Sequence, residues 1–167
     1  MANLRDIKRR IRSVKNTQQI TKAMKLVSAS KLRKAQERIL SVRPYAIKMM
    51  EVLRHLAARA GEDLHPLLSN REGNRIIILV ITADKGLCGA FSSGILRKTM
   101  QVVRENEGKE ISFLVAGRKG RDFMRNRKFK VLHEFTNWAK EFDYLKAAEI
   151  GDILSELFIN NVAYKVY

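Results

Sequence analysis

The sequence has 167 residues, with 33 lysines and arginines against 17 aspartates and glutamates, and a net charge of +16 at neutral pH. Residues 1–60 hold 16 of the basic residues and three acidic ones, Asp6, Glu37 and Glu51, so this segment carries +13 and the other 107 residues carry +3. This division excludes a uniformly charged globule. An apolar content of 46% excludes a wholly disordered chain, and no run of 18 apolar residues is present to span a bilayer.

The cysteine content and the N-terminus indicate the compartment. Cys88 is the single cysteine, so an internal disulfide is excluded and a reducing compartment is favoured. The N-terminus is charged but lacks the apolar segment of a secretory signal. An organellar transit peptide would also be basic, but the apolar periodicity continues beyond the length of a presequence, which favours a structural role for this segment.

Residues 3–60 are predicted to form one long helix, because helix-favouring residues dominate and Pro44 is the only glycine or proline. A bend is expected at Val42–Tyr45, since proline lacks an N–H and collides with the preceding turn. Apolar residues recur at alternating intervals of three and four, which predicts a coiled-coil seam that slips around residues 18–28. The seam consists of Leu4, Ile7, Ile11, Val14, Leu32, Ala35, Ile39, Val42, Ala46, Met49, Leu53 and Leu56.

A helix of residues 3–59 would be roughly 85 Å long, whereas a domain of about 100 residues has a radius of gyration near 13 Å. The helix must therefore project beyond its own domain, and its seam would face water unless a second helix covered it. The sequence contains no such second helix. We expect the partner helix to lie outside the 167 residues.

The charge of the helix has three interpretations. It can be a solvated helix face, a track along an acidic protein, or a nucleic-acid-binding surface. Tyr45 is the only aromatic residue in residues 1–60, although nucleic-acid binding usually adds stacking aromatics. An acidic macromolecular partner is therefore favoured, and a basic-helix nucleic-acid-binding protein remains the alternative.

Residues 61–74 are expected to form a linker, and residues 75–167 an α/β domain. The apolar run Ile76–Ile81 is typical of a strand buried on both faces of a parallel sheet. Further strands are expected at 111–116, 131–135 and 163–167, and helices at 91–105, around Met124, and at 144–158. The alternation predicts an open, mostly parallel, Rossmann-like sheet with flanking helices. Because the chain stops inside an element, the sheet is expected to be incomplete at the C-terminus.

The only candidate for enzymatic chemistry is the glycine-bearing loop Thr82–Gly89, because phosphates often bind after the first strand of such a sheet. Its spacing matches neither G-x-G-x-x-G nor G-x-x-x-x-G-K-[ST]. No base is adjacent to Cys88, which we expect to be a small buried apolar residue. No two of His55, His65 and His133 have metal-ligand spacing. The sequence predicts no catalytic residue, no cofactor and no metal ion.

Two segments carry a family resemblance: residues 16–35, NTQQITKAMKLVSASKLRKA, and residues 81–91, ITADKGLCGAF. They resemble the gamma subunit of F-type ATP synthase, the central rotor stalk. The two segments occur in the right order with the expected linker between them, and the resemblance covers essentially the whole chain. It implies a non-catalytic shaft that couples proton-driven rotation of the membrane c-ring to ATP synthesis or hydrolysis at the beta subunits.

The resemblance also implies partners and a location. The partners would be the alpha and beta subunits of the catalytic head, the epsilon subunit, the c-ring and a C-terminal helix of the protein's own that these 167 residues lack. A start at Met1 without a presequence favours the cytoplasmic face of a bacterial cell membrane over an organellar inner or thylakoid membrane. The residues implied to contact the alpha/beta ring are Ile20, Met24, Lys25, Lys31, Arg33 and Lys34 on the helix, and Asp84, Lys85, Gly86, Leu87, Cys88 and Gly89 in the loop.

Overall fold

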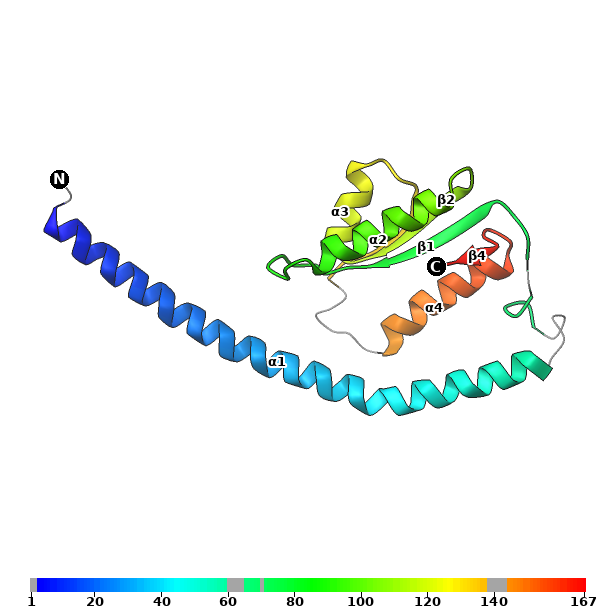
Figure 1. Ribbon diagram of the computed structural model, residues 1–167, viewed down its shortest axis with the longest axis horizontal. Coiled ribbons are helices and arrows are strands. Elements are labelled where there is room, and N and C mark those ends of the chain that lie inside the picture. Colours follow the sequence, from blue (N-terminus) through cyan, green and yellow to red (C-terminus); the bar gives the residue numbers. More distant parts are fainter. Residues whose placement is uncertain (1–2, 60–64, 70, 138–143) are drawn as a thin grey trace. The chain divides into compact units, whose positions relative to one another are not determined.

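The computed structural model describes residues 3–59, 65–69, 71–137 and 144–167. The chain divides into two compact units, residues 1–60 and 61–167. The first unit is a single helix, and the second is a sheet with helices on both faces (Figure 1). The predicted α/β class is confirmed.

The first unit is helix α1, Leu4–Arg59, which continues for 56 residues with Pro44 inside it and with no buried residue. Figure 1 shows its axis changing direction in the cyan part of the ribbon, the part in which the bend was expected. Pro44 cannot donate a backbone hydrogen bond, so the carbonyl of Leu40 has no helical partner four residues on. The helix tolerates this loss because solvent reaches its whole surface.

Some hydroxyl groups of α1 donate hydrogen bonds to the main chain of the preceding turn. The hydroxyls of Thr17 and Ser41 donate to the main-chain carbonyls of Ser13 and Arg38 at 3.0 and 2.8 Å. Ion pairs within α1 are limited, over residues 3–59, to Arg33 with Glu37 at 2.8 Å and Lys48 with Glu51 at 2.7 Å. Because the other basic residues of 3–59 make no ion pair there, most of the positive charge of α1 is available to an outside partner.

The second unit is a four-stranded parallel sheet with strand order β3-β2-β1-β4. The predicted strands and helices are all present, but the last strand is two residues long instead of five. The elements are β1 Arg75–Ile81, α2 Phe91–Glu105, β2 Glu110–Ala116, α3 Arg118–Asn126, β3 Val131–Phe135, α4 Tyr144–Ile159 and β4 Lys165–Val166.

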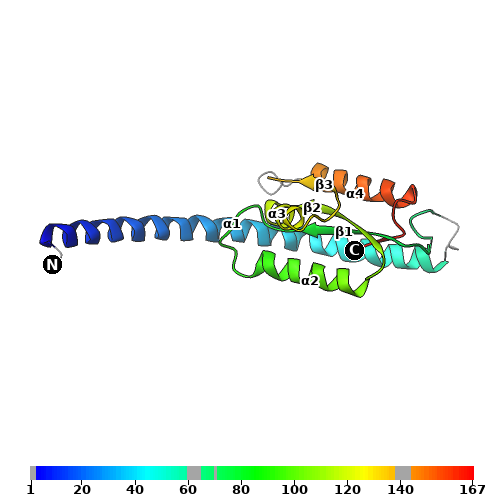
Figure 2. The ribbon, with the colours of Figure 1, turned by 90° about the horizontal axis from the view of Figure 1, so that it is seen from above.

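Helices cover both faces of the sheet, which explains the largely apolar sequences of β1 and β2 (Figure 2). On one face, Ile78 and Phe113 pack with Leu96 of α2 and Met124 of α3. On the other face, Ile77 and its neighbours pack against Ile153, Leu154 and Leu157 of α4. The ends of β1 and β2 are therefore held rigidly, and they position the loops that follow them.

Two glycines allow α3 to approach the end of β1. A Cβ on Gly117 would lie 2.2 Å from the carbonyl oxygen of Thr82, and one on Gly120 would lie 2.8 Å from Val115. Gly117 also has φ +105°, a conformation that side chains other than glycine rarely adopt. The GRKG sequence at 117–120 therefore serves close packing between α3 and the sheet.

Gly117→Ala is expected to reduce the free energy of unfolding by more than about 3 kcal/mol, because the new Cβ overlaps backbone atoms and φ is unfavourable. Urea denaturation followed by hydrogen exchange at the β1 and β2 amides measures the change. Gly94→Ala is the matched control, since its Cβ would meet no atom within 4 Å. Gly94 lies inside α2, so this substitution should stabilise by about 0.5–1 kcal/mol. Equal effects of the two substitutions would contradict the packing argument.

Candidate functional site

The basic segment of α1 presents two different faces. At about 100° per residue, Ile20, Met24, Lys31 and Lys34 fall within roughly 80° of one another on the helix, and Lys25 and Arg33 fall on the opposite side. All six side chains are exposed. The structure therefore brings four of the expected contact residues together and separates the other two from them.

Arg33 differs from the four residues of that face because its Nε lies 2.8 Å from a carboxylate oxygen of Glu37. Both side chains are largely exposed, so this pair contributes little to stability. It does reduce the net charge on its side of α1. We call the four-residue group the 20–34 face; it combines the charges of Lys31 and Lys34 with the apolar side chains of Ile20 and Met24.

The loop after β1 is held at its base by an N-terminal cap on α3. Gly120 N donates to the Thr82 hydroxyl at 2.8 Å, and Lys119 N donates to the Ala83 carbonyl at 3.1 Å. Arg118 N donates to Asp84 Oδ1 at 3.0 Å. Three consecutive residues at the end of β1 therefore satisfy the first three N–H groups of α3, which a helix would otherwise leave without partners.

Asp84 has a structural role in addition to its place in the loop. The same Oδ1 atom also accepts a hydrogen bond from Asn137 N at 3.1 Å. Asn137 has φ +59°, and its side-chain oxygen accepts from Arg118 Nη2 at 3.0 Å. Asp84 therefore joins the end of β1, the start of α3 and the segment after β3, and its Oδ1 atom accepts two donors from its own chain.

Beyond Asp84 the loop projects into solvent. Lys85, Gly86, Leu87, Cys88 and Gly89 are all exposed, and Leu87 is exposed in full. Leu87 has φ +62°, a left-handed conformation that costs a residue other than glycine about 1 kcal/mol or more. A loop with a fixed base thus presents a large apolar side chain in a strained backbone.

The prediction that Cys88 is buried is wrong, because the thiol is exposed. Its Sγ lies 3.8 Å from the carbonyl oxygen of Lys85 and 3.8 Å from the hydroxyl of Ser92. Neither group is a base, so these contacts provide no activation of a nucleophile. The prediction failed because it placed the residue in the core on the basis of its size, whereas the capped base directs this part of the loop outward.

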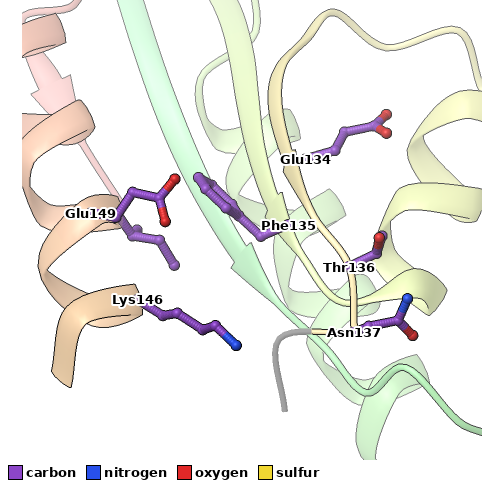
Figure 3. Close-up of a pocket in the computed structure, with 7 residues that line it drawn as sticks. Glu134, Phe135, Thr136, Asn137, Lys146 and Glu149 are labelled. Atoms are coloured by element: carbon purple, nitrogen blue, oxygen red, sulfur yellow. The ribbon is translucent and has the colours of Figure 1, made fainter. Parts of the chain in front are cut away.

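A cavity of about 320 Å³ lies between the end of β3 and α4 (Figure 3). Phe135 points toward α4, while Glu134 points away from it. The Glu134 carboxylate makes a two-pronged pair with the guanidinium of Arg125, and this hydrogen bond raises the pKa of Arg125. The polar groups of the lining do not converge on one point, so the cavity lacks the donor arrangement of a nucleotide or phosphate site.

The other shifted pKa values belong to surface pairs. The Lys130 ammonium hydrogen-bonds Glu110 and lowers the pKa of that carboxyl group. Hydrogen bonding between Lys165 and Tyr167 raises the pKa of the lysine and lowers that of the tyrosine. These pairs lie outside the loop Thr82–Gly89. Over the described ranges, no three His, Cys, Asp or Glu side chains are close enough together to hold a metal ion.

The comparison with protein families matches residues 3–167 to the family described as ATP synthase. The chain belongs to the ATP synthase gamma family. It is 45% identical over 170 residues to the ATP synthase gamma chain of Pelotomaculum thermopropionicum, with 100% of this chain and 60% of that protein covered. It is 42% identical to the gamma chain of Halothermothrix orenii, with 99% and 58% covered. The chain thus spans about 60% of the length of these gamma chains.

The fold also occurs in a solved ATP synthase structure. A chain of the Euglena gracilis mitochondrial ATP synthase, determined with OSCP, F1 and the c-ring in rotational state 3, matches with a TM-score of 0.58 at 18% identity. The match covers 91% of this chain and 48% of that one. At this identity the likeness concerns the fold. Among the described residues, no helix is long and apolar enough to cross a membrane.

Sequence reasoning missed the cap on α3. Thr82, Ala83 and Asp84 were treated as part of a candidate binding loop, and their hydrogen bonds to residues 118–120 were not foreseen. The pairing of a Thr-x-Asp strand end with a G-x-x-G helix start is a signal that could have indicated the cap.

Asp84→Ala is expected to destabilise the second unit by about 1–2 kcal/mol, because it leaves the Arg118 and Asn137 N–H groups without their acceptor. Faster hydrogen exchange at these two amides, measured together with urea denaturation, checks the result. Asp152→Ala is the control, since this exposed residue of α4 makes no side-chain hydrogen bond or ion pair within the described residues. If both variants unfolded at the same urea concentration, the cap would not contribute to stability.

Proposed function

We propose that this chain forms part of the central stalk of an F-type ATP synthase. In this role α1 is one strand of the rotor shaft, and the α/β unit lies at the foot of the stalk. The observation that carries the proposal is a 56-residue helix with no buried residue, in a chain that belongs to the gamma family. An apolar seam along such a helix requires a covering surface, and a shaft provides one through a second helix of the same protein.

The stalk is proposed to be non-catalytic and to couple rotation of the membrane c-ring to nucleotide turnover at the beta subunits. Support comes from the loop that most resembled a phosphate site. Thr82, Ala83 and Asp84 at its base accept hydrogen bonds from the first main-chain N–H groups of α3, so these donors are used within the chain, and Asp84 also accepts from Asn137 N. The proposed location is the cytoplasmic face of a bacterial membrane, in keeping with the bacterial relatives.

The proposed partners are the alpha and beta subunits, the epsilon subunit, the c-ring and the protein's own C-terminal helix. We propose that the 20–34 face and the projecting loop meet the alpha/beta ring, while Lys25 and Arg33 on the other side of α1 meet either this ring or the second helix. A rotor passes several equivalent sites in turn, so its contacts must be weak enough to break at each step. Exposed charges provide such weak attraction. Lys31 and Lys34 have this character, and Ile20 and Met24 add a small apolar surface.

The nucleic-acid alternative has no specific observation in its favour. Tyr45 is the single aromatic residue of α1, and no stacking platform accompanies it within residues 3–59. The basic charge alone explains non-specific, salt-sensitive attraction to any polyanion.

The charge pattern of α1 provides a test. In an ATP synthase assembled with a full-length gamma chain that carries this sequence, K31E/K34E should lower ATP synthesis roughly fivefold, equivalent to about 1 kcal/mol at the rotor contact. K25E/R33E changes the net charge by the same amount on the opposite face and should have a smaller effect. Synthesis by inverted membrane vesicles, normalised to the amount of assembled enzyme, is the measurement. Equal losses of ATP synthesis in the two double variants would show that the total charge of α1 matters and not the face that carries it. Wild-type rates of synthesis in both variants would contradict the proposed electrostatic contact.

The projecting loop provides a second test. Leu87→Asn should leave the free energy of unfolding unchanged or raise it by about 0.5 kcal/mol, because asparagine tolerates the left-handed conformation and Leu87 is exposed. In the assembled enzyme the same variant should lower the rate of ATP synthesis, since the apolar contact with the ring is lost. Normal synthesis by this variant would exclude Leu87 from the contact.

A further inference from the structure

Arg71 joins the start of the α/β unit to the end of α4. Its Nε donates to the Ser69 hydroxyl at 2.9 Å, and its Nη2 donates to the Pro66 carbonyl at 3.3 Å. Its Nη1 donates to the main-chain carbonyl of Phe158 and to the side-chain oxygen of Asn161, the latter at 2.7 Å. The guanidinium carbon also lies 4.6 Å from the centre of the Phe158 ring. We call this group the Arg71 clamp.

The acceptors of the Arg71 clamp lie at the C-terminal end of α4, which has a regular capping motif. Val162 N donates to the Leu157 carbonyl at 2.9 Å, and Asn161 N donates to the Phe158 carbonyl at 3.1 Å. Asn161 has φ +56°. These are the two hydrogen bonds and the left-handed residue of a Schellman motif, with Asn161 in the position that usually holds glycine. Asparagine tolerates this conformation and adds a side-chain acceptor, which Arg71 uses.

The positive charge of Arg71 lies in a favourable position, at the C-terminal end of α4. The carboxyl end of a helix carries partial negative charge, and a cation there is stabilised. A guanidinium also holds its donors in a fixed plane, so several hydrogen bonds and a stacked ring define its direction as well as its place. Arg71 is half-buried, which limits competition from water. A lysine ammonium would retain the charge but not this fixed geometry.

The same two segments are joined beyond Arg71. Arg75 Nη2 donates to the Asn161 carbonyl at 2.9 Å, and Tyr164 N donates to the Arg75 carbonyl at 3.0 Å. A Cβ on Gly73 would lie 3.2 Å from the Tyr164 Cβ, so the segments pack closely. Residues 71–75 are therefore fastened to residues 158–164, which lie almost ninety positions away in the sequence.

We propose that Arg71 is a positioning residue that transmits twist between the segment that follows α1 and the α/β unit. This inference rests on the proposed role of the chain in a rotor. A covalent connection alone transmits little torque, because rotation about its backbone dihedrals absorbs the applied twist. A segment that is fixed in direction on a helix end moves with that helix, so rotation at one end of the connection reaches the other.

The test uses an ATP synthase assembled with a full-length gamma chain that carries this sequence, in inverted membrane vesicles. The readout is the ratio of ATP-driven proton pumping to ATP hydrolysis at equal gamma content. Arg71→Ala should lower the ratio roughly threefold or more while hydrolysis continues. Arg71→Lys should lower the ratio less, because lysine keeps the positive charge but lacks the planar guanidinium group that makes the other contacts. A variant that only reduced folding would lower both activities together.

Two further variants act on the acceptor side of the clamp. Asn161→Gly keeps the left-handed turn but removes the side-chain acceptor, and Phe158→Leu removes the stacked ring but keeps the main-chain carbonyl. Both should lower the ratio less than Arg71→Ala. Arg104→Ala is the control, because Arg104 is an exposed arginine of α2 without a side-chain hydrogen bond or ion pair in the described residues.

The outcomes are distinct. A wild-type ratio in Arg71→Ala, or equal losses of pumping and hydrolysis in all clamp variants, would overturn the inference and leave the proposed function intact. A wild-type chain that assembles but supports no pumping would refute the proposed function, and the inference with it. A lowered ratio in the clamp variants, with a normal one in Arg104→Ala, supports the transmission role.

Discussion

The close approach between the end of β1 and the start of α3 is the constraint on which the α/β unit depends. Glycine at 117 and 120 lets the two elements meet, and Thr82, Ala83 and Asp84 then satisfy the first N–H groups of the helix. This junction orients α3 on the sheet, fixes the segment after β3 through Asn137, and sets the direction in which Lys85–Gly89 leave the domain. The exposure of Leu87 and Cys88 follows from it, because the capped base directs the rest of the loop outward.

Much of the fold could be predicted from the sequence, because its signals are local. The 56-residue helix follows from composition and periodicity, and the apolar run of β1 predicts a strand buried on both faces. The Asp84 cap and the Arg71 clamp could not be predicted in this way. The contacts that join separate elements in both groups link residues 34 to 90 positions apart, and such hydrogen bonds leave no periodic pattern in the sequence. Cys88 was misplaced for the same reason, since the direction of its loop depends on a distant helix.

The expected contact residues illustrate a second limit of sequence reasoning. The family resemblance grouped six residues of the segment 20–34 as one contact surface, but a continuous helix distributes them over two sides. Ile20, Met24, Lys31 and Lys34 share a face, whereas Lys25 and Arg33 oppose it. This assignment to two sides holds because α1 is continuous through residues 18–34. The helix thereby turns one candidate site into two surfaces with different chemistry.

The absence of buried residues in α1 has a consequence for how the chain acquires its structure. The contacts of α1 are local and form rapidly, whereas the parallel pairing of β1 with β2 joins residues 35 positions apart and must close a long loop first. Without tertiary packing, the helical order of α1 depends on intrinsic propensity and opposes the repulsion of its own charges. The helix content of α1 therefore depends on the ionic strength and on the partners that contact it. Rising ionic strength screens that repulsion and increases helix content in the free chain, while the same salt weakens attraction to an acidic partner.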